Sequence, residues 1–285
     1  MYDESKSAWP DDASARPPPA PVGQPGIDGI EYAPIARPAN LSQYPSLNLG
    51  WREALLDLLG VFGLMIGAEI LLGGAVRRLI ERYPESGIFL LNTMFGVFTI
   101  VAVGLFVWGR HLRASSLGLS RPNVRMVIGA LVLGIPACFL AAMAGATLYV
   151  WTTGSSMDDI VQQREGFFAL VPDPSIMTFV LFAGFTGFHE ELLFRGFALP
   201  RLCVILRSRF LGVIACSIIF GLVHGYQGAV SIYQTAMLSV VFCGLVLLSR
   251  SLWPAVLVHA AFNAINFALI PIIRDHLPEL LERTS

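Results

Sequence analysis

The sequence is poor in charged residues, and this shortage argues against a soluble globular protein. Asp, Glu, Lys and Arg make up 14% of its 285 residues, whereas soluble domains carry about 25%. Hydrophobic residues account for 55%. Lys6 is the only lysine and the net charge is −1, so the composition offers no electrostatic basis for binding nucleic acid.

Cysteine is scarce and is not arranged in the pairs that metal and redox sites require. The chain has four cysteines, and none belongs to a CxxC motif. Each lies in or beside an apolar run: Cys138, Cys203, Cys216 and Cys243. We therefore expect small buried hydrophobic residues rather than a disulfide framework or a cysteine metal cluster.

The chain divides into a polar segment and a long apolar one. Residues 1–49 are rich in proline and poor in large apolar side chains, which predicts a disordered tail. From residue 50 to residue 285 apolar runs dominate, at about 54–76, 88–109, 126–151, 176–199, 210–226, 229–249 and 252–273. This pattern predicts an all-α transmembrane bundle of about seven to eight spans, because lipid admits only backbones that satisfy their own hydrogen bonds.

Ionisable residues inside the apolar runs are candidates for function, because each costs at least ~2.5–3.5 kcal/mol to insert. Glu69 lies in the first run without a partner at helical spacing, and a structural role is the expectation for it. The fourth run contains Glu190, Glu191 and Arg195. Glu191 and Arg195 are four residues apart, the favourable order for an ion pair within a helix, so Glu190 remains free to act as a general base.

Two further runs carry histidine or asparagine. His224 ends the fifth run, and the midpoint between it and Glu190 falls in the polar turn at residues 207–209. An antiparallel hairpin about this turn would bring the two side chains to one level. His259 and Asn263 lie four residues apart in the seventh run and share a helical face. Either residue alone could simply join helices, but together these groups favour a common site.

The polar set permits two kinds of hydrolytic chemistry. A glutamate and a histidine can deprotonate a water molecule held between them, while neutral donors stabilise an oxyanion. Glutamate and histidine also bind zinc; a zinc ion, if present, is expected on Glu190, His224 and His259. The zincin motif HExxH is excluded because Leu193 replaces its second histidine. No other cofactor is expected.

The order and spacing of these residues resemble a known family. Glu190, Glu191 and Arg195 form EExxxR, Phe220 and His224 form FxxxH, and His259 and Asn263 form HxxxN. Over about residues 176–270 the chain is similar to the CAAX protease and bacteriocin-processing family of intramembrane peptidases, a family commonly labelled metallopeptidase. The resemblance implies that Glu190 is the base together with His224. It further implies that His259 and Asn263 line the oxyanion site, with Glu191 and Arg195 in support.

The resemblance also sets expectations for the substrate and the location of the protein. It implies cleavage of membrane-associated proteins or peptides within a lipid bilayer, and we expect the bacterial cytoplasmic membrane. A prenylated CAAX substrate does not follow, and the oligomeric state is left open. An inert membrane scaffold or a bacteriocin-immunity-type protein with the same fold is the alternative, and an ion-coupled transporter is a third hypothesis. The presence of all six motif residues favours the enzyme.

Overall fold

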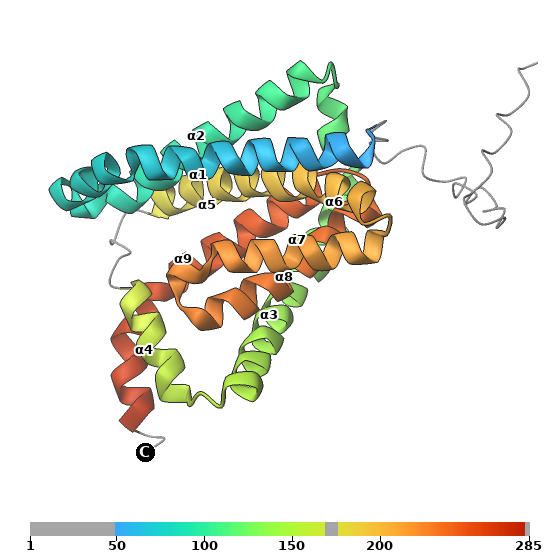
Figure 1. Cartoon of the computed structure of the whole chain (residues 1–285). Helices are drawn as coiled ribbons and strands as arrows, with labels where there is room; N and C mark the ends of the chain where they lie inside the picture. Colours follow the sequence, from blue (N-terminus) through green and yellow to red (C-terminus); the bar gives the residue numbers. More distant parts are fainter. Residues whose placement is uncertain (1–48, 169–175, 283–285) are drawn as a thin grey trace, which may run out of the picture. The chain divides into compact units, whose positions relative to one another are not determined.

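The computed structural model describes residues 49–168 and 176–282, and all regular secondary structure in these ranges is helical. The predicted tail, apart from its last residue, lies outside them. Figure 1 shows the helices in chain order: α1 Trp51–Arg82, α2 Pro84–Gly109, η2 Ala114–Leu117, α3 Val124–Thr153, α4 Met157–Phe168, α5 Ile176–Glu191, η3 Leu192–Ala198, α6 Leu199–Ile205, α7 Arg209–Val223, η4 Gly225–Gln227, α8 Ala229–Ser249 and α9 Trp253–Glu282. The predicted all-helical class is confirmed.

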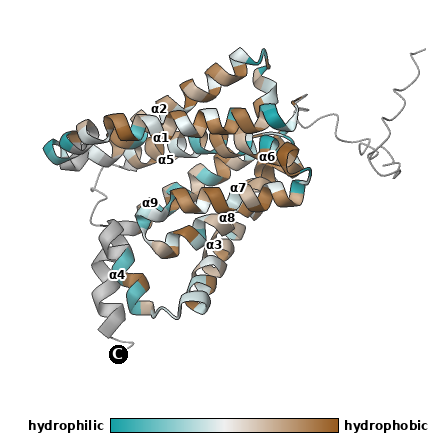
Figure 2. Cartoon of the chain, viewed as in Figure 1, coloured by the Kyte–Doolittle hydropathy of each residue, from teal (hydrophilic) through white to brown (hydrophobic). Residues whose placement is uncertain are grey.

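Four of these helices are long and apolar enough to cross a membrane. They are Trp51–Ala75 of α1, Phe89–Gly109 of α2, the whole of α3 and the whole of α8; α7 and Trp253–Leu269 of α9 are shorter apolar helices. Large apolar side chains point outward on them, with Leu71 82% and Trp151 81% exposed. Figure 2 shows hydrophobic residues along much of these helices. Such surfaces need lipid rather than water, so the protein is an integral membrane protein.

A continuous helical path through α5, η3 and α6 lies at the centre of the bundle. Helices α1 and α2 pack against this path, and so do α7 and α9. Helices α3 and α8 pack against each other and against α9, and α8 also packs against α7. The middle segment, η3, is a π-helix whose residues are all buried. The sequence predicted one apolar run here and gave no sign of the π-helical turns.

The predicted hairpin after this path is present. Helix α6 ends at Ile205 and α7 begins at Arg209, where the Ser208 hydroxyl accepts a hydrogen bond from the Leu211 amide at 3.3 Å. A serine at this position satisfies one of the free N–H groups at a helix start. Helix α7 is only 15 residues long, so its C-terminal end reaches the interior of the bundle and carries His224 there.

Asp57 of α1 fixes how α1 lies against α6. The carboxylate is fully buried; Oδ2 accepts from Arg201 Nε at 3.0 Å and Nη2 at 2.9 Å, and Oδ1 accepts from Arg110 Nε at 2.9 Å. The buried carboxylate, held by two guanidinium groups, joins α1 to the C-terminal end of α2 and to α6, which is distant in sequence. Asp57 was not among the functional or structural residues predicted from the sequence.

The segment between the apolar runs 126–151 and 176–199 contains a helix of its own, α4. Helix α4 begins beside Ser156, whose backbone amide donates to the Asp159 carboxylate at 2.7 Å while the Asp159 amide donates to the Ser156 hydroxyl at 3.2 Å. This reciprocal pair resembles a capping box, in which two free donors at a helix start are satisfied.

Close contact between α5 and α9 depends on Gly187. A Cβ atom at this position would lie 3.0 Å from the Ala260 backbone nitrogen and 3.2 Å from the Val256 carbonyl oxygen. These distances are tighter than ordinary van der Waals contact, and both neighbours are backbone atoms that cannot rotate away. The absence of a side chain at this glycine therefore lets α9 come close enough to bring His259 beside α5.

We expect Gly187→Ala to displace α9 and to lower the thermal stability of the purified protein. The matched control is Gly184→Ala on the same helix, where a new Cβ has no atom within 4 Å and alanine has the better helix propensity. Thermal unfolding in detergent measures both. Equal melting temperatures for the two variants would contradict the packing role of Gly187.

Candidate active site

Two adjacent carboxylates at the end of α5 lie in different environments. The Glu191 side chain is fully buried, whereas the Glu190 side chain is 14% exposed and lines a cavity. Consecutive residues of an α-helix are rotated by about 100°, which explains the separation. The sequence predicted that the two acids would serve different neighbours, and the structure agrees.

Glu191 joins α5 to η3 and to α9. Its Oε1 atom accepts from Arg195 Nη1 at 2.8 Å and lies 2.9 Å from His259 Nδ1. The guanidinium group also lies 4.3 Å from the centre of the Phe220 ring and 5.1 Å from that of Phe242, distances at which a cation is attracted to an aromatic face. The predicted ion pair is thus present, and the contact with His259 is an addition to it.

His224 directs one ring nitrogen at Glu190. The residue caps the end of α7, and its Nδ1 lies 2.7 Å from the Phe220 carbonyl oxygen. A carbonyl oxygen can only accept a hydrogen bond, so Nδ1 carries the proton. Nε2 then faces Glu190 Oε2 at 3.7 Å. This contact bears out the level pairing that the hairpin predicted.

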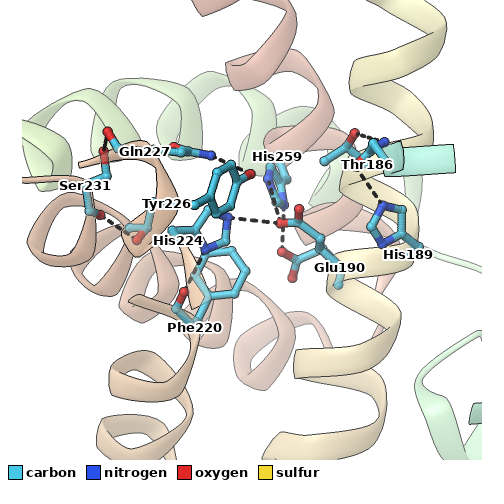
Figure 3. A network of polar contacts seen from close by, with 12 residues as sticks. Thr186, His189, Glu190, Phe220, His224, Tyr226, Gln227, Ser231 and His259 are labelled. Carbon is cyan, nitrogen blue, oxygen red and sulfur yellow. Dashed lines mark hydrogen bonds and ion pairs between the residues drawn. The ribbon is translucent and has the colours of Figure 1, made fainter. Parts of the chain in front are cut away.

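His259 directs a second ring nitrogen at the same carboxylate oxygen. Its Nδ1 is engaged by Glu191, and its Nε2 lies 3.8 Å from Glu190 Oε2. The Phe242 ring stacks on the imidazole with centroids 4.6 Å apart. Figure 3 shows the rings of His224 and His259 pointing toward Glu190, whereas His189 lies beside Thr186 and away from His224. Glu190 is therefore shared by two histidines from different helices.

The carboxylate and both histidines open into a large cavity with a mostly apolar wall. The cavity has a volume of about 1740 Å³ and is also lined by the amides of Asn263 and Asn266. Asn266 donates to the Phe262 carbonyl oxygen at 2.7 Å. Four of the six predicted site residues face this cavity, and the other two, Glu191 and Arg195, lie buried behind it.

Polar contacts between α2 and α5 were not predicted from the sequence. Asn92 donates from Nδ2 to Thr186 Oγ1 at 2.9 Å, and its Oδ1 lies 3.4 Å from His189 Nε2. These contacts hold α2 against α5 one helical turn before Glu190. An asparagine inside the apolar run 88–109 was a signal that could have indicated it.

The residues expected to bind zinc are not arranged as a metal site in the described part of the chain. Within residues 49–168 and 176–282, no group of three or more His, Cys, Asp and Glu side chains is arranged to hold a metal ion. Glu190, His224 and His259 lie near one another but do not form such a group. No step of the chemistry is therefore assigned to a metal.

We expect Arg195→Met to destabilise the protein by about 3–5 kcal/mol, because it leaves the Glu191 charge buried without its cation. The double variant Glu191→Leu/Arg195→Met removes both charges and should recover much of that loss. Arg113→Met, at an exposed arginine, is the control and should have little effect. Unfolding of each variant in the same detergent measures the differences, and an Arg195→Met change no larger than that of the control would refute the role of the pair.

Comparisons with known proteins bear on the region that carries this site. Residues 172–265 match a family model described as "Rce1-like: Type II CAAX prenyl endopeptidase Rce1-like". Searches among curated proteins and among solved structures gave no match. The matched residues include the EExxxR, FxxxH and HxxxN motifs. Over this segment, the resemblance to the CAAX protease and bacteriocin-processing family of intramembrane peptidases is confirmed.

Proposed function

We propose that this protein is an endopeptidase that cleaves membrane-associated proteins or peptides within the bacterial cytoplasmic membrane. The observation that carries the proposal is the convergence of two imidazole Nε2 atoms on Glu190 Oε2, at 3.7 and 3.8 Å, in the wall of a cavity large enough for a peptide segment. The family match supports the reaction class.

The hydrogen bonds of His224 favour the activation of a water molecule. With Nδ1 committed to a carbonyl oxygen, the neutral ring presents a lone pair at Nε2, and the Glu190 carboxylate is also an acceptor. Two acceptors cannot hydrogen-bond to each other, but one water molecule can donate a hydrogen bond to each of these two, which lie 3.7 Å apart. In the proposed reaction Glu190 takes a proton from this water as the water oxygen attacks the scissile carbonyl carbon. The protonated Glu190 then gives that proton to the amide nitrogen as the C–N bond breaks and the amine leaves.

Asn263 and His259 are the proposed donors to the oxyanion that forms. The Asn263 amide can donate without a change of protonation. His259 already uses Nδ1 toward Glu191, so Nε2 can donate only when the ring carries both protons. The buried Glu191 carboxylate partly balances the charge of such an imidazolium. Glu191 is therefore proposed to be a positioning residue that acts through His259.

We expect Glu190→Gln and His224→Asn each to reduce peptide cleavage by at least ~10²-fold. Glu190→Gln removes the base that takes the proton of the attacking water, and His224→Asn removes the ring nitrogen that accepts a hydrogen bond from that water. Cleavage is followed with apolar fluorogenic peptides in detergent or nanodiscs, and thermal unfolding confirms that the variants remain folded. His111→Asn, at an exposed histidine, is the control. Full activity in either site variant would reject the mechanism; wild-type protein inactive on every membrane peptide would favour an inert scaffold or immunity-type protein.

The metal-free mechanism predicts that activity survives removal of divalent ions. We expect dialysis against a strong chelator to leave the cleavage rate unchanged, and elemental analysis of active protein to find less than stoichiometric zinc. A loss of activity that added zinc restores would overturn this part of the proposal and return Glu190, His224 and His259 to the role of metal ligands.

A further inference from the structure

Glu69 is an ionisable residue that the proposed mechanism does not use. It lies in the apolar span Trp51–Ala75 of α1 and is exposed. No hydrogen bond or ion pair joins it to another residue in the described part of the chain. A carboxylate at such a position is costly without a cationic partner, and an intramembrane acid is by default a candidate for function.

Contacts between α1 and the central helical path set the depth of Glu69. Asp57 of α1 contacts Arg201, and Phe62 of α1 packs on Phe194 with ring centroids 6.1 Å apart. Moving forward along α1 therefore corresponds to moving backward along the central path, so the two run antiparallel. From the Phe62–Phe194 level, Glu69 lies ~10 Å further along α1 and Glu190 lies ~6 Å back along its own helix. The two carboxylates are level to within about one helical turn.

Glu69 and Glu190 also face the same cavity. Phe62, Met65 and Ile66 of α1 line it together with Glu69, so this stretch of α1 forms a wall of the space into which Glu190 opens. A segment bound next to Glu190 would pass this wall at the depth of the Glu69 carboxylate.

Apart from the histidines, the charged side chains that line the cavity in the described part of the chain are acidic. Glu69 and Glu190 lie at the level of the site, Glu81 lies ~18 Å further along α1, and the described lining includes neither lysine nor arginine. Most of the remaining lining residues are apolar. The occupant that complements this wall is an apolar segment carrying a positive charge, because a charge pair in a low-dielectric site discriminates strongly between partners.

We propose that Glu69 is a specificity-determining residue that binds a lysine or arginine side chain of the substrate close to the scissile bond. This inference rests on the proposed function and adds a substrate class to it: an apolar membrane segment with a cationic residue near the cleavage site. The carboxylate forms an ion pair with the cation, and the surrounding apolar wall contacts the rest of the segment.

The test uses apolar peptides that differ only in one residue near the scissile bond, which is Lys, Gln or Glu. Both peptide ends are blocked, so that this side chain carries the only varied charge. Values of kcat/KM are measured for the wild type, Glu69→Gln and Glu69→Lys in nanodiscs of neutral lipid. The matched control is Glu81→Gln, an acid of the same helix and cavity that lies ~18 Å further along α1.

We expect the wild type to prefer the Lys peptide over the Gln peptide by about tenfold. Glu69→Gln should lose this preference through a higher KM, Glu69→Lys should prefer the Glu peptide, and Glu81→Gln should keep the wild-type preference. An unchanged preference in Glu69→Gln, or an equal loss in Glu81→Gln, would overturn the inference.

A binding measurement separates this inference from the proposed function. Fluorescently labelled Lys and Gln peptides are titrated into Glu190→Gln protein with and without Glu69→Gln. Preferential binding of the Lys peptide that disappears with Glu69→Gln supports the recognition role even if no peptide is cleaved. Equal binding of both peptides by both proteins refutes it, whatever the result of the cleavage assay.

Discussion

The arrangement of the site depends on one oxygen atom, Oε1 of Glu191. This atom accepts from the Arg195 guanidinium at 2.8 Å and lies 2.9 Å from the His259 imidazole. All three side chains are buried, so the negative charge cannot rely on water and must be balanced by these partners. Because Nδ1 of His259 is held in this way, its Nε2 is directed at Glu190. Glu191, buried behind the cavity wall, thus positions the histidine ring that contacts Glu190 in that wall.

The features of the site that the sequence predicted are those that depend on spacing along one helix or about one turn. The four-residue interval between Glu191 and Arg195 predicted their ion pair, and the structure has it. The symmetry of Glu190 and His224 about the turn at 207–209 predicted their approach, and their 3.7 Å contact agrees. The long apolar runs likewise predicted an all-helical membrane protein, because a helix satisfies all of its backbone hydrogen bonds within one segment, as lipid requires.

The contacts that the sequence could not predict join residues that are distant in the chain. Arg201 and Asp57 are 144 positions apart, and Asn92 and Thr186 are 94 apart. Helical periodicity fixes the face on which a residue lies, but it does not say which helices become neighbours. The span count illustrates the same limit. About seven to eight spans were predicted. Four described helices are long and apolar enough to cross a membrane alone, and α7 and Trp253–Leu269 are shorter apolar helices, whose depth in the bilayer cannot be read from their length.

The π-helix η3 governs the angular relation between the two halves of the central path. Before it, Glu190 faces α7 and α9; after it, Arg201 faces α1. Each residue of an α-helix turns by about 100°, so π-helical turns over residues 192–198 give the following residues a different phase from that of an uninterrupted α-helix. A one-residue deletion that restored the α-helix there would rotate Arg201 off Asp57. Such turns are often found at functional sites. Here the π-helix changes the direction in which later side chains point, so that one continuous helical path contacts α7 and α9 before η3 and α1 after it.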